Sequence, residues 1–283
     1  MTNGGKNITS LPSARVEAER HESHELLPGE LRSGFIVLCD HASNFIPPEY
    51  ANLGLPPGEL ERHIAWDIGA AGVARRLAGM LRAPAVISRF SRLLIDPNRG
   101  LDDPTLVMRI SDGAVIPGNA HAGEDEKRRR VERFYRPYDE AISALIGRFR
   151  RAGIDPALLS IHSFTPVWRG MARPWHAALL YDPRDVDFST HLMNALMRSD
   201  PRLIVGDNEP YRGGLQGDTM DRHGYEKGLP NALVEIRQDL IADAAGQEEW
   251  ARRIAHAARH ALDAMGGLQE YRGPGKSNAA INH

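Results

Sequence analysis

Short apolar runs alternate with longer stretches of helical periodicity along most of the chain. The runs are punctuated by Gly, Pro or Asp, which is typical of buried strands. The predicted strands are Phe35–Cys39, Ala85–Ser88, Leu93–Ile95, Leu158–Ile161, Ala177–Tyr181, Leu203–Val205 and Ala232–Ile236. The predicted helices are Pro57–Leu81, Glu124–Arg151, Phe188–Arg198 and Gln247–Met265. This alternation predicts an α/β fold, a mixed and mostly parallel sheet with helices on both faces.

The two ends of the chain differ in composition from this alternating middle. Residues 1–30 are polar and rich in Ser, Glu and His, whereas 272–283 hold Gly-Pro-Gly and small polar residues. We predict a flexible N-terminal arm over 1–30, one α/β domain over 31–271 and a C-terminal tail over 272–283. The chain shows no apolar secretory signal, and no apolar run approaches the roughly 20 residues that span a bilayer. We therefore expect a cytoplasmic protein without a membrane partner.

The charge balance narrows the possible partners further. The 283 residues include 35 Lys and Arg against 37 Asp and Glu, a formal net charge of −2. This balance provides no electrostatic footprint for nucleic acid or an anionic membrane. A single Cys excludes a disulfide framework and a cysteine-rich metal site. Nothing in the sequence indicates the oligomeric state.

Chemically versatile residues follow or end several of the apolar runs. Ligands of open α/β sheets gather at the carboxyl ends of the strands, so these positions are informative. Residues 40–44 (Asp-His-Ala-Ser-Asn) follow the first run, 96–100 (Asp-Pro-Asn-Arg-Gly) follow the third, and His162 follows the fourth. Glu235 lies inside the last run. Two histidines, an Asn-Arg pair and a carboxylate are thus predicted on one rim.

These residue types match the parts of a metal-assisted hydrolase. Two imidazoles and a carboxylate suit Zn²⁺, which takes nitrogen and oxygen donors and lowers the pKa of water to about 7. A second carboxylate can act as general base on that water. An Arg guanidinium binds a substrate carboxylate with two parallel hydrogen bonds. The pattern indicates an amide hydrolase whose substrate is a small molecule with a free carboxylate.

Five stretches between about Phe35 and Leu240 carry a family resemblance. They are His41-Ala42-Ser43-Asn44, Ala65-Trp66-Asp67-Ile68-Gly69, Asp96-Pro97-Asn98-Arg99, Ile161-His162-Ser163 and Val234-Glu235-Ile236-Arg237-Gln238-Asp239-Leu240. Together they resemble the N-formylglutamate amidohydrolase family. The resemblance extends to Asn208-Glu209-Pro210-Tyr211 and His223-Gly224-Tyr225. It implies the zinc carboxypeptidase and aspartoacylase fold, a zinc cofactor, and N-formyl-L-glutamate as the substrate.

The resemblance also suggests a set of metal ligands, with one departure. The wider superfamily has a Glu three residues after the first ligand His, where this chain has Asn44. Asn is a poor zinc donor, so the third ligand is Asp67 or Asn44, and we favour Asp67. The expected metal ligands are thus His41, Asp67 and His162, with zinc or another divalent metal.

The resemblance assigns catalytic roles as well. Glu235 is expected to be the general base. Arg92 is expected to stabilise the oxyanion, with Arg89 as the alternative. A nucleophilic pair of Cys39 and His41 is disfavoured, because a Cys within an apolar strand is usually a small core residue.

The remaining expected site residues bind substrate. Asn98 and Arg99 are expected to hold the substrate carboxylate, while His223 and Tyr225 are candidates for a further substrate contact or a second proton donor. Two other functions stay open: a carboxypeptidase-like hydrolase of small peptides or cell-wall fragments, and a non-catalytic protein that binds a metal or an acidic metabolite. The non-catalytic alternative is supported by Asn44, which stands where the superfamily has Glu.

Overall fold

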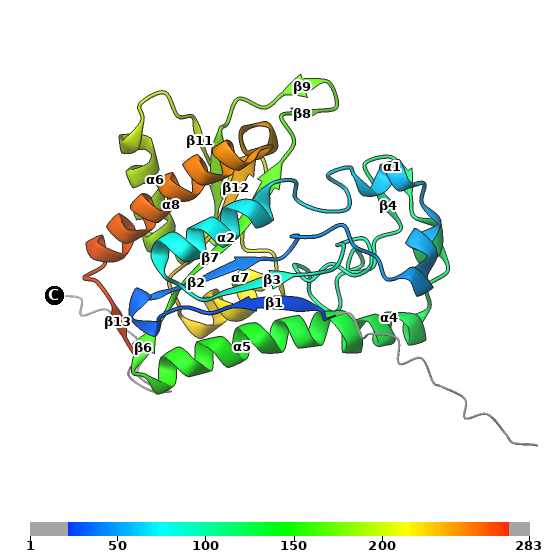
Figure 1. The fold of residues 1–283 in the computed structure, drawn as a ribbon, viewed down its shortest axis with the longest axis horizontal. Coiled ribbons are helices and arrows are strands. Elements are labelled where there is room, and N and C mark those ends of the chain that lie inside the picture. Colours follow the sequence, from blue (N-terminus) through cyan, green and yellow to red (C-terminus); the bar gives the residue numbers. More distant parts are fainter. Residues whose placement is uncertain (1–21, 272–283) are drawn as a thin grey trace, which may run out of the picture.

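The computed structural model describes residues 22–271 (Figure 1). Within this range one seven-stranded sheet has the order β1-β3-β2-β7-β12-β10-β11. Its strands are β1 (His24–Leu27), β2 (Phe35–Cys39), β3 (Ala85–Ser88), β7 (Ala157–Phe164), β10 (Ala177–Leu180), β11 (Val205–Asp207) and β12 (Asn231–Arg237). The pairs β3-β2, β2-β7, β7-β12 and β10-β11 are parallel, and β1-β3 and β12-β10 are antiparallel. The sheet is therefore mixed and mostly parallel, as predicted.

The other elements cover the sheet or extend beyond it. The α-helices are α1 (Pro57–Leu60), α2 (Ala70–Leu81), α3 (Pro117–Ala120), α4 (Glu124–Arg130), α5 (Arg136–Arg151), α6 (Asp187–Ser199), α7 (Thr219–His223) and α8 (Ala244–Ala264). The 3-10 segments are Leu31–Ser33, Pro48–Gly54, Tyr225–Lys227 and Gln238–Ile241, and a π-helical turn at Val131–Tyr135 joins α4 to α5. Three small strand pairs complete the structure: β4 (Ile110–Ser111) with β5 (Ala114–Val115), β6 (Ile154–Asp155) with β13 (Gln269–Glu270), and β8 (Val167–Trp168) with β9 (Met171–Ala172).

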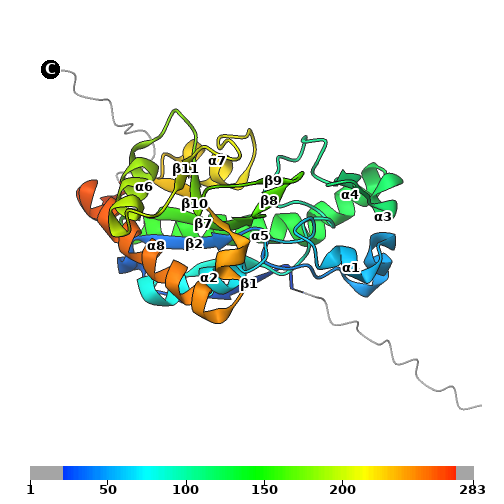
Figure 2. The same ribbon diagram turned by 90° about the horizontal axis from the view of Figure 1, so that it is seen from above.

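Strand β2 separates two hydrophobic cores. Its side chains alternate between the two faces of the sheet, as in any strand. Phe35, Val37 and Cys39 belong to the core beneath α2, α6 and α8. Ile36 and Leu38 belong to the core beneath α5. Helices thus cover both faces, as predicted: Figure 1 shows the sheet between α2 and α8 on one side and α5 on the other, and Figure 2 shows α8 in front of the sheet.

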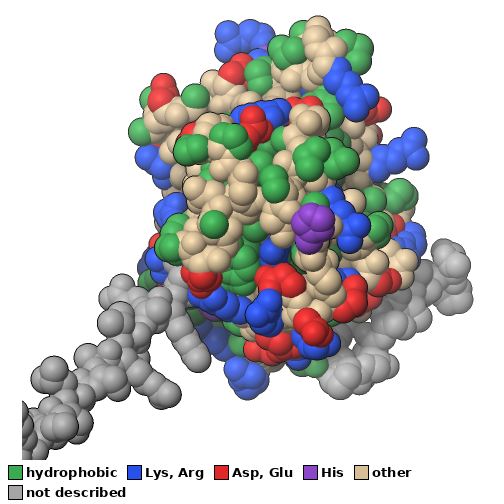
Figure 3. Space-filling view, turned by 90° about the vertical axis from the view of Figure 1, so that its right-hand side faces the viewer, with side chains coloured by type: hydrophobic (Ala, Val, Ile, Leu, Met, Phe, Trp, Pro, Cys, Tyr) green, Lys and Arg blue, Asp and Glu red, His purple; other side chains and the backbone are tan. Residues whose placement is uncertain are grey.

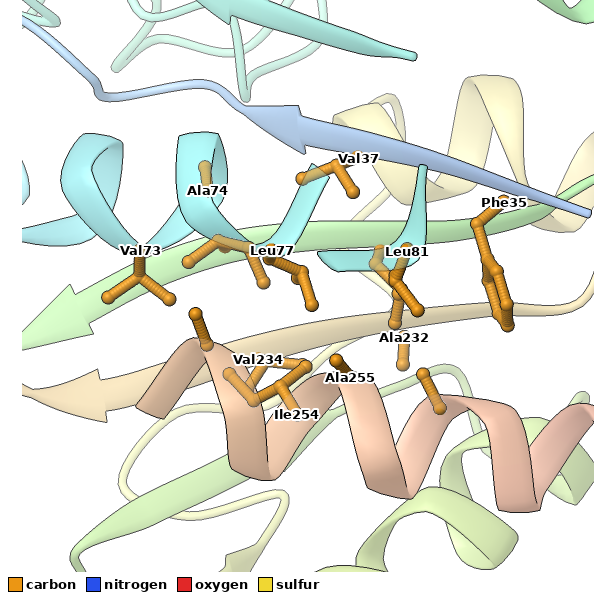
Figure 4. Packing of buried hydrophobic residues seen from close by; sticks show 14 of the residues in the cluster. Phe35, Val37, Val73, Ala74, Leu77, Leu81, Ala232, Val234, Ile254 and Ala255 are labelled. Atoms are coloured by element: carbon orange, nitrogen blue, oxygen red, sulfur yellow. The ribbon is translucent and has the colours of Figure 1, made fainter. Parts of the chain in front are cut away.

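Part of the first core lies between α2 and α8. Leu77 of α2 and Ile254 of α8 are fully buried and lie over the sheet beside Val234 (Figure 4). The buried side of α8 is rich in alanine, which lets it pack closely against α2. Each large aliphatic side chain buried here contributes roughly 1.5–3 kcal/mol of transfer free energy. This packing anchors the strands that carry the polar residues discussed below.

Two predicted elements differ in the structure. The run Leu93–Ile95 is buried but forms turns, because side chains bind its carbonyl groups: Asn119 donates to Leu93 and Arg130 donates to Leu94. Side-chain donors here take the place of a strand partner. The predicted helix over Pro57–Leu81 is also wrong as one element, since turns separate α1 from α2. Those turns bring Asp67 back to the sheet, where its N–H donates to the carbonyl of His41 at 2.9 Å.

The predicted N-terminal arm is partly wrong. His24–Leu27 forms the edge strand β1 and pairs with β3 in antiparallel register. Residues 1–21 of the arm and the tail 272–283 lie outside the described residues. Among the described residues, no helix is long and apolar enough to cross a membrane.

Candidate active site

Three neighbouring parallel strands bring the predicted residues to one edge of the sheet. His41 lies just beyond the end of β2, His162 lies within β7, and Glu235 lies within β12. Glu235 is the register partner of His162, so the two are direct neighbours across the strand pair. Because β2, β7 and β12 run parallel, their carboxyl ends meet at the same edge. The predicted common rim is thus present.

Asp67 joins the two histidines from outside the sheet. Its Oδ2 lies 2.7 Å from Nδ1 of His162 and 3.3 Å from Nδ1 of His41. One ligand atom from each of the three residues lies within 4.8 Å of the others, and all three side chains are buried. Donors that share one tetrahedral zinc ion at about 2.0–2.2 Å lie about 3.3 Å apart. The His41–Asp67–His162 cluster therefore has the atoms, spacing and burial to hold a divalent metal ion.

A glycine shapes the turn that carries Asp67. Gly69 has a φ of +83°, a conformation that L residues with a side chain rarely adopt. A Cβ atom at this position would lie 2.3 Å from the carbonyl oxygen of Ile241. The chain can therefore turn from Asp67 into α2 in this narrow space because residue 69 is glycine.

Two further carboxylates bind the outer nitrogens of the histidines. Nε2 of His41 lies 2.7 Å from Oδ1 of Asp96, and Nε2 of His162 lies 3.1 Å from Oδ2 of Asp40. An imidazole that donates from Nε2 keeps a lone pair on Nδ1, so both rings can direct that lone pair at a metal ion beside Asp67. The sequence assigned no role to Asp40 or Asp96. Both directly follow apolar runs, and each lies within three residues of an expected site residue, His41 and Arg99 respectively.

The carboxyl groups of the site have opposite pKa shifts. Burial opposes ionisation of Asp40, yet the hydrogen bond and charge of His162 lower its pKa to about 2. The pKa of Asp67 is also lowered, against burial, by His41 and His162. By contrast, burial raises the pKa of Glu235 to about 7. Its Oε2 is buried without a hydrogen-bond partner among the described residues. The carboxyl group of Glu235 is thus suited to exchange protons near neutral pH.

The cluster opens into a cavity of about 460 Å³. This volume is within the usual range for small-molecule sites. The predicted residues that line it are His41, Asp67, Arg92, Asn98, Arg99, His162 and Glu235. The segment after His162 contributes Ser163, Phe164, Thr165 and Trp168 to the lining. The cavity joins the metal-binding cluster, a free carboxyl oxygen and arginine side chains in one space.

The arginines of the cavity have different partners. Nη2 of Arg92 lies 2.8 Å from Oδ2 of Asp96, so its charge is partly compensated. Arg99 donates from Nη1 to the carbonyl of Asn98 at 2.8 Å and from Nε to the hydroxyl of Thr105 at 3.2 Å. Asn98 is itself held by the N–H of Thr219, which donates to its Oδ1 at 3.0 Å. Asn98 therefore supports Arg99 through its backbone.

Arg89 and Asn44, the two alternatives from the sequence, do not line the cavity. Arg89 is exposed and pairs with Glu22 at 3.2 Å. The amide of Asn44 donates to the carbonyl of Leu60 at 3.0 Å. The structure thus places Arg92 and Asp67 in the site in preference to these alternatives.

His223 and Tyr225, which were expected to contact substrate, do not line the cavity. Nε2 of His223 points to Oδ1 of Asp139 on α5 at 2.6 Å, and the ring is buried. Tyr225 lies under the guanidinium of Arg184, 4.0 Å from the ring centroid.

Two hairpins lie beside the cavity. Asp112 between β4 and β5 and Trp168 on β8 both line the cavity, and the imidazole of His63 contacts them. His63 Nε2 lies 3.5 Å from Oδ2 of Asp112, and its ring meets Trp168 edge-on at 5.9 Å. Figure 3 views this end of the molecule and shows hydrophobic side chains gathered above a band of charged ones. No motif in the sequence marked these positions.

Comparisons with known proteins were made against families, curated proteins and solved structures. The sequence model of the N-formylglutamate amidohydrolase family matches residues 33–242. Comparison with curated proteins gives no match. A gene product of Agrobacterium tumefaciens is similar in structure, with a TM-score of 0.80, 33% identity, and coverage of 87% of this chain and 97% of that chain.

A second solved structure, an N-formylglutamate amidohydrolase from Ralstonia eutropha, has a similar fold. Its TM-score is 0.66 at 20% identity, with coverage of 85% of this chain and 97% of that chain. The family match spans most of the described residues and includes every metal-cluster residue as well as Glu235. The chain therefore belongs to the N-formylglutamate amidohydrolase family and is a hydrolase of carbon–nitrogen bonds other than peptide bonds.

Proposed function

We propose that the enzyme hydrolyses N-formyl-L-glutamate to formate and L-glutamate. A divalent metal ion, for which zinc is our first choice, is bound by His41, Asp67 and His162. The observation that carries this proposal is the position of Glu235. Glu235 lines the same cavity as His41, Asp67, His162 and three arginines, and its buried Oε2 has no hydrogen-bond partner among the described residues. Family membership supports the choice of substrate.

The side chains of the cavity divide the reaction between them. A metal ion bound at the cluster supplies Lewis acidity, which polarises the amide carbonyl and lowers the pKa of water. Glu235 accepts the proton of the attacking water and delivers it to the departing amine nitrogen. Arg92 stabilises the negative charge that develops on the carbonyl oxygen. Arg99 binds the α-carboxylate and so fixes the amide relative to Glu235.

The position of Asp67 also bears on the non-catalytic alternative. That alternative depended on Asn44 replacing a ligand Glu, which would leave the metal site with two histidines. Asp67 lies against both histidines and supplies a third donor from another segment. The departure at Asn44 therefore no longer favours a protein without turnover.

A metal-dependent formate-release assay tests the proposal. The purified protein is assayed on N-formyl-L-glutamate as isolated, after complete chelation, and after zinc is restored. We expect activity with about one metal ion per chain, loss on chelation and recovery with zinc. His162→Ala should abolish both metal binding and activity, whereas His256→Ala, at an exposed position on α8, should change neither. Full activity in metal-free enzyme would refute the mechanism, and hydrolysis of a small peptide or N-acetyl-L-glutamate in preference would refute the substrate.

A further inference from the structure

Arg99 and Arg212 line the cavity, and neither forms a salt bridge with a carboxylate among residues 22–271, although the charge of Arg99 acts on Asp96. Arg92, the other arginine of the lining, differs because it is paired with Asp96. In the proposed function, Arg99 binds the α-carboxylate of the substrate. Arg212 leaves a second, uncompensated positive charge at the exposed rim of the same cavity.

The segment that carries Arg212 is anchored to the sheet. Oδ1 of Asn208 accepts hydrogen bonds from the N–H groups of Tyr181 and Gly213, each at 3.1 Å. A Cβ atom on Gly213 would lie 2.3 Å from the backbone nitrogen of Tyr181. The segment thus lies directly against the end of β10, with Arg212 beside its anchor. Such anchoring lowers the entropic cost of binding a ligand.

The same segment contacts the one that carries Arg99. A Cβ atom on Gly217 would lie 2.8 Å from Cα of Gly100, so the two backbones touch. The guanidinium of Arg222 holds both, because it donates to the carbonyls of Pro97 at 3.1 Å and of Gly217. Arg99 and Arg212 are consequently presented by two joined segments of one cavity wall.

We propose that Arg212 forms a second anion subsite, which binds the side-chain carboxylate of the substrate's amino-acid half. This inference rests on the proposed function, in which Arg99 binds the α-carboxylate. A guanidinium binds a carboxylate in a fixed two-bond geometry, so it distinguishes a carboxylate from an amide of the same shape. The enzyme is then selective for N-acyl derivatives of dicarboxylic amino acids over those of their neutral counterparts.

The test compares glutamate with glutamine in two independent measurements. The first is kcat/KM for N-formyl-L-glutamate and N-formyl-L-glutamine. The second is the Kd of the free products, L-glutamate and L-glutamine, for the metal-loaded enzyme, which needs no turnover. In wild type we expect a preference for glutamate of about 10- to 100-fold in each, the effect of a hydrogen bond to a charged group.

Matched variants locate the source of that preference. Arg212→Gln should remove the preference by weakening glutamate alone, and Arg212→Lys should retain part of it. Arg99→Gln should weaken both ligands and keep their ratio. Arg198→Gln, at an exposed position on α6 outside the cavity, should change nothing.

Two results would overturn the subsite: no preference in wild type, or an unchanged preference in Arg212→Gln. Failure of wild type to hydrolyse either formyl compound would refute the proposed function. The Kd ratio would still decide whether Arg212 recognises the side-chain carboxylate.

Discussion

Asp40 accepts a hydrogen bond from Nε2 of His162 at 3.1 Å and thereby determines which nitrogen of that ring faces the cavity. Asp40 is fully buried, and its two oxygens also accept hydrogen bonds from the hydroxyls of Tyr138, Ser160 and Thr219. A carboxylate fixed in this way orients the imidazole and increases its basicity as a ligand. The metal-binding geometry therefore depends on a residue that does not line the cavity.

The first prediction concerns this contact. Asp40→Asn keeps the shape of the side chain but removes its charge, so we expect metal affinity to fall by about 10- to 100-fold. Competition with a chelator of known affinity measures the change in metal Kd. Asn44→Ala is the control, since the Asn44 amide binds the Leu60 carbonyl and lies outside the cluster. Equal affinity in Asp40→Asn and wild type would contradict the orienting role.

The second prediction separates proton transfer from metal binding. Glu235→Gln is isosteric and removes the general base, so kcat should fall by about 10²- to 10⁴-fold. Metal content and KM should change little, because Glu235 is not one of the three clustered ligands. Steady-state kinetics together with metal analysis of the same sample provide the measurement. Glu226→Gln, at an exposed position, is the control. Loss of the metal in Glu235→Gln would instead assign Glu235 to the ligand set.

The fold could be predicted where burial and secondary structure have the same cause. Phe35–Cys39 is fully buried in the middle of a parallel sheet, and such strands appear in sequence as continuous apolar runs. Leu93–Ile95 has the same appearance, yet the side chains of Asn119 and Arg130 satisfy its backbone. Local sequence does not contain that distant information. The edge strand β1 was missed because His24–Leu27 is only half-buried and mixes polar with apolar residues.

Some residues of the candidate site could be predicted from the sequence and others could not, for similar reasons. His41, His162 and Glu235 could be predicted to lie together because parallel strands end at one edge. Asp67 lies in a turn, and it was suggested by its motif rather than by its place in the fold. His223 does not line the cavity but contacts Asp139 of α5, and local sequence does not contain the information for such a distant contact. Arg212 gave no local signal, since its significance comes from the charges that surround it in space.

The third prediction tests the turn at Gly69. Alanine there would be forced into a φ of +83° and against the Ile241 carbonyl, so Gly69→Ala should destabilise the protein by at least about 1–3 kcal/mol. Because the turn positions Asp67, metal affinity should fall as well. Gly79→Ala in α2 is the matched control: its Cβ meets nothing within 4 Å, and alanine should stabilise the helix by about 0.5–1 kcal/mol. Urea unfolding of both variants measures the difference, and a neutral Gly69→Ala would show that the turn can relax.

The fourth prediction concerns pH and the buried carboxyl of Asp218, which caps α7 by accepting from the N–H of Asp221 at 2.8 Å. Burial raises its pKa to about 6 from an ordinary value of 3.8. Between these two values the folded protein holds a proton that the unfolded chain has lost, so this group's contribution to stability falls as pH rises from about 4 to 6. Asn caps a helix as well as Asp but carries no charge.

Asp218→Asn should therefore match wild type in stability near pH 4 and exceed it near pH 7, by at most about 3 kcal/mol for a shift of this size. Asp139 provides the opposite case. Its pKa is lowered, against burial, by His223 and Arg222, so its contribution to stability is present above about pH 4 and is lost as pH falls below that value; Asp139→Asn should therefore be less stable than wild type near pH 7 and approach it below pH 4. Urea unfolding of the three proteins at several pH values gives the differences directly. If Asp218→Asn is already as much more stable than wild type at pH 4 as it is at pH 7, removal of the charge is not the cause of the added stability. Since Asp218 also lines the cavity, a stable but less active variant would indicate that the buried charge is kept for the reaction.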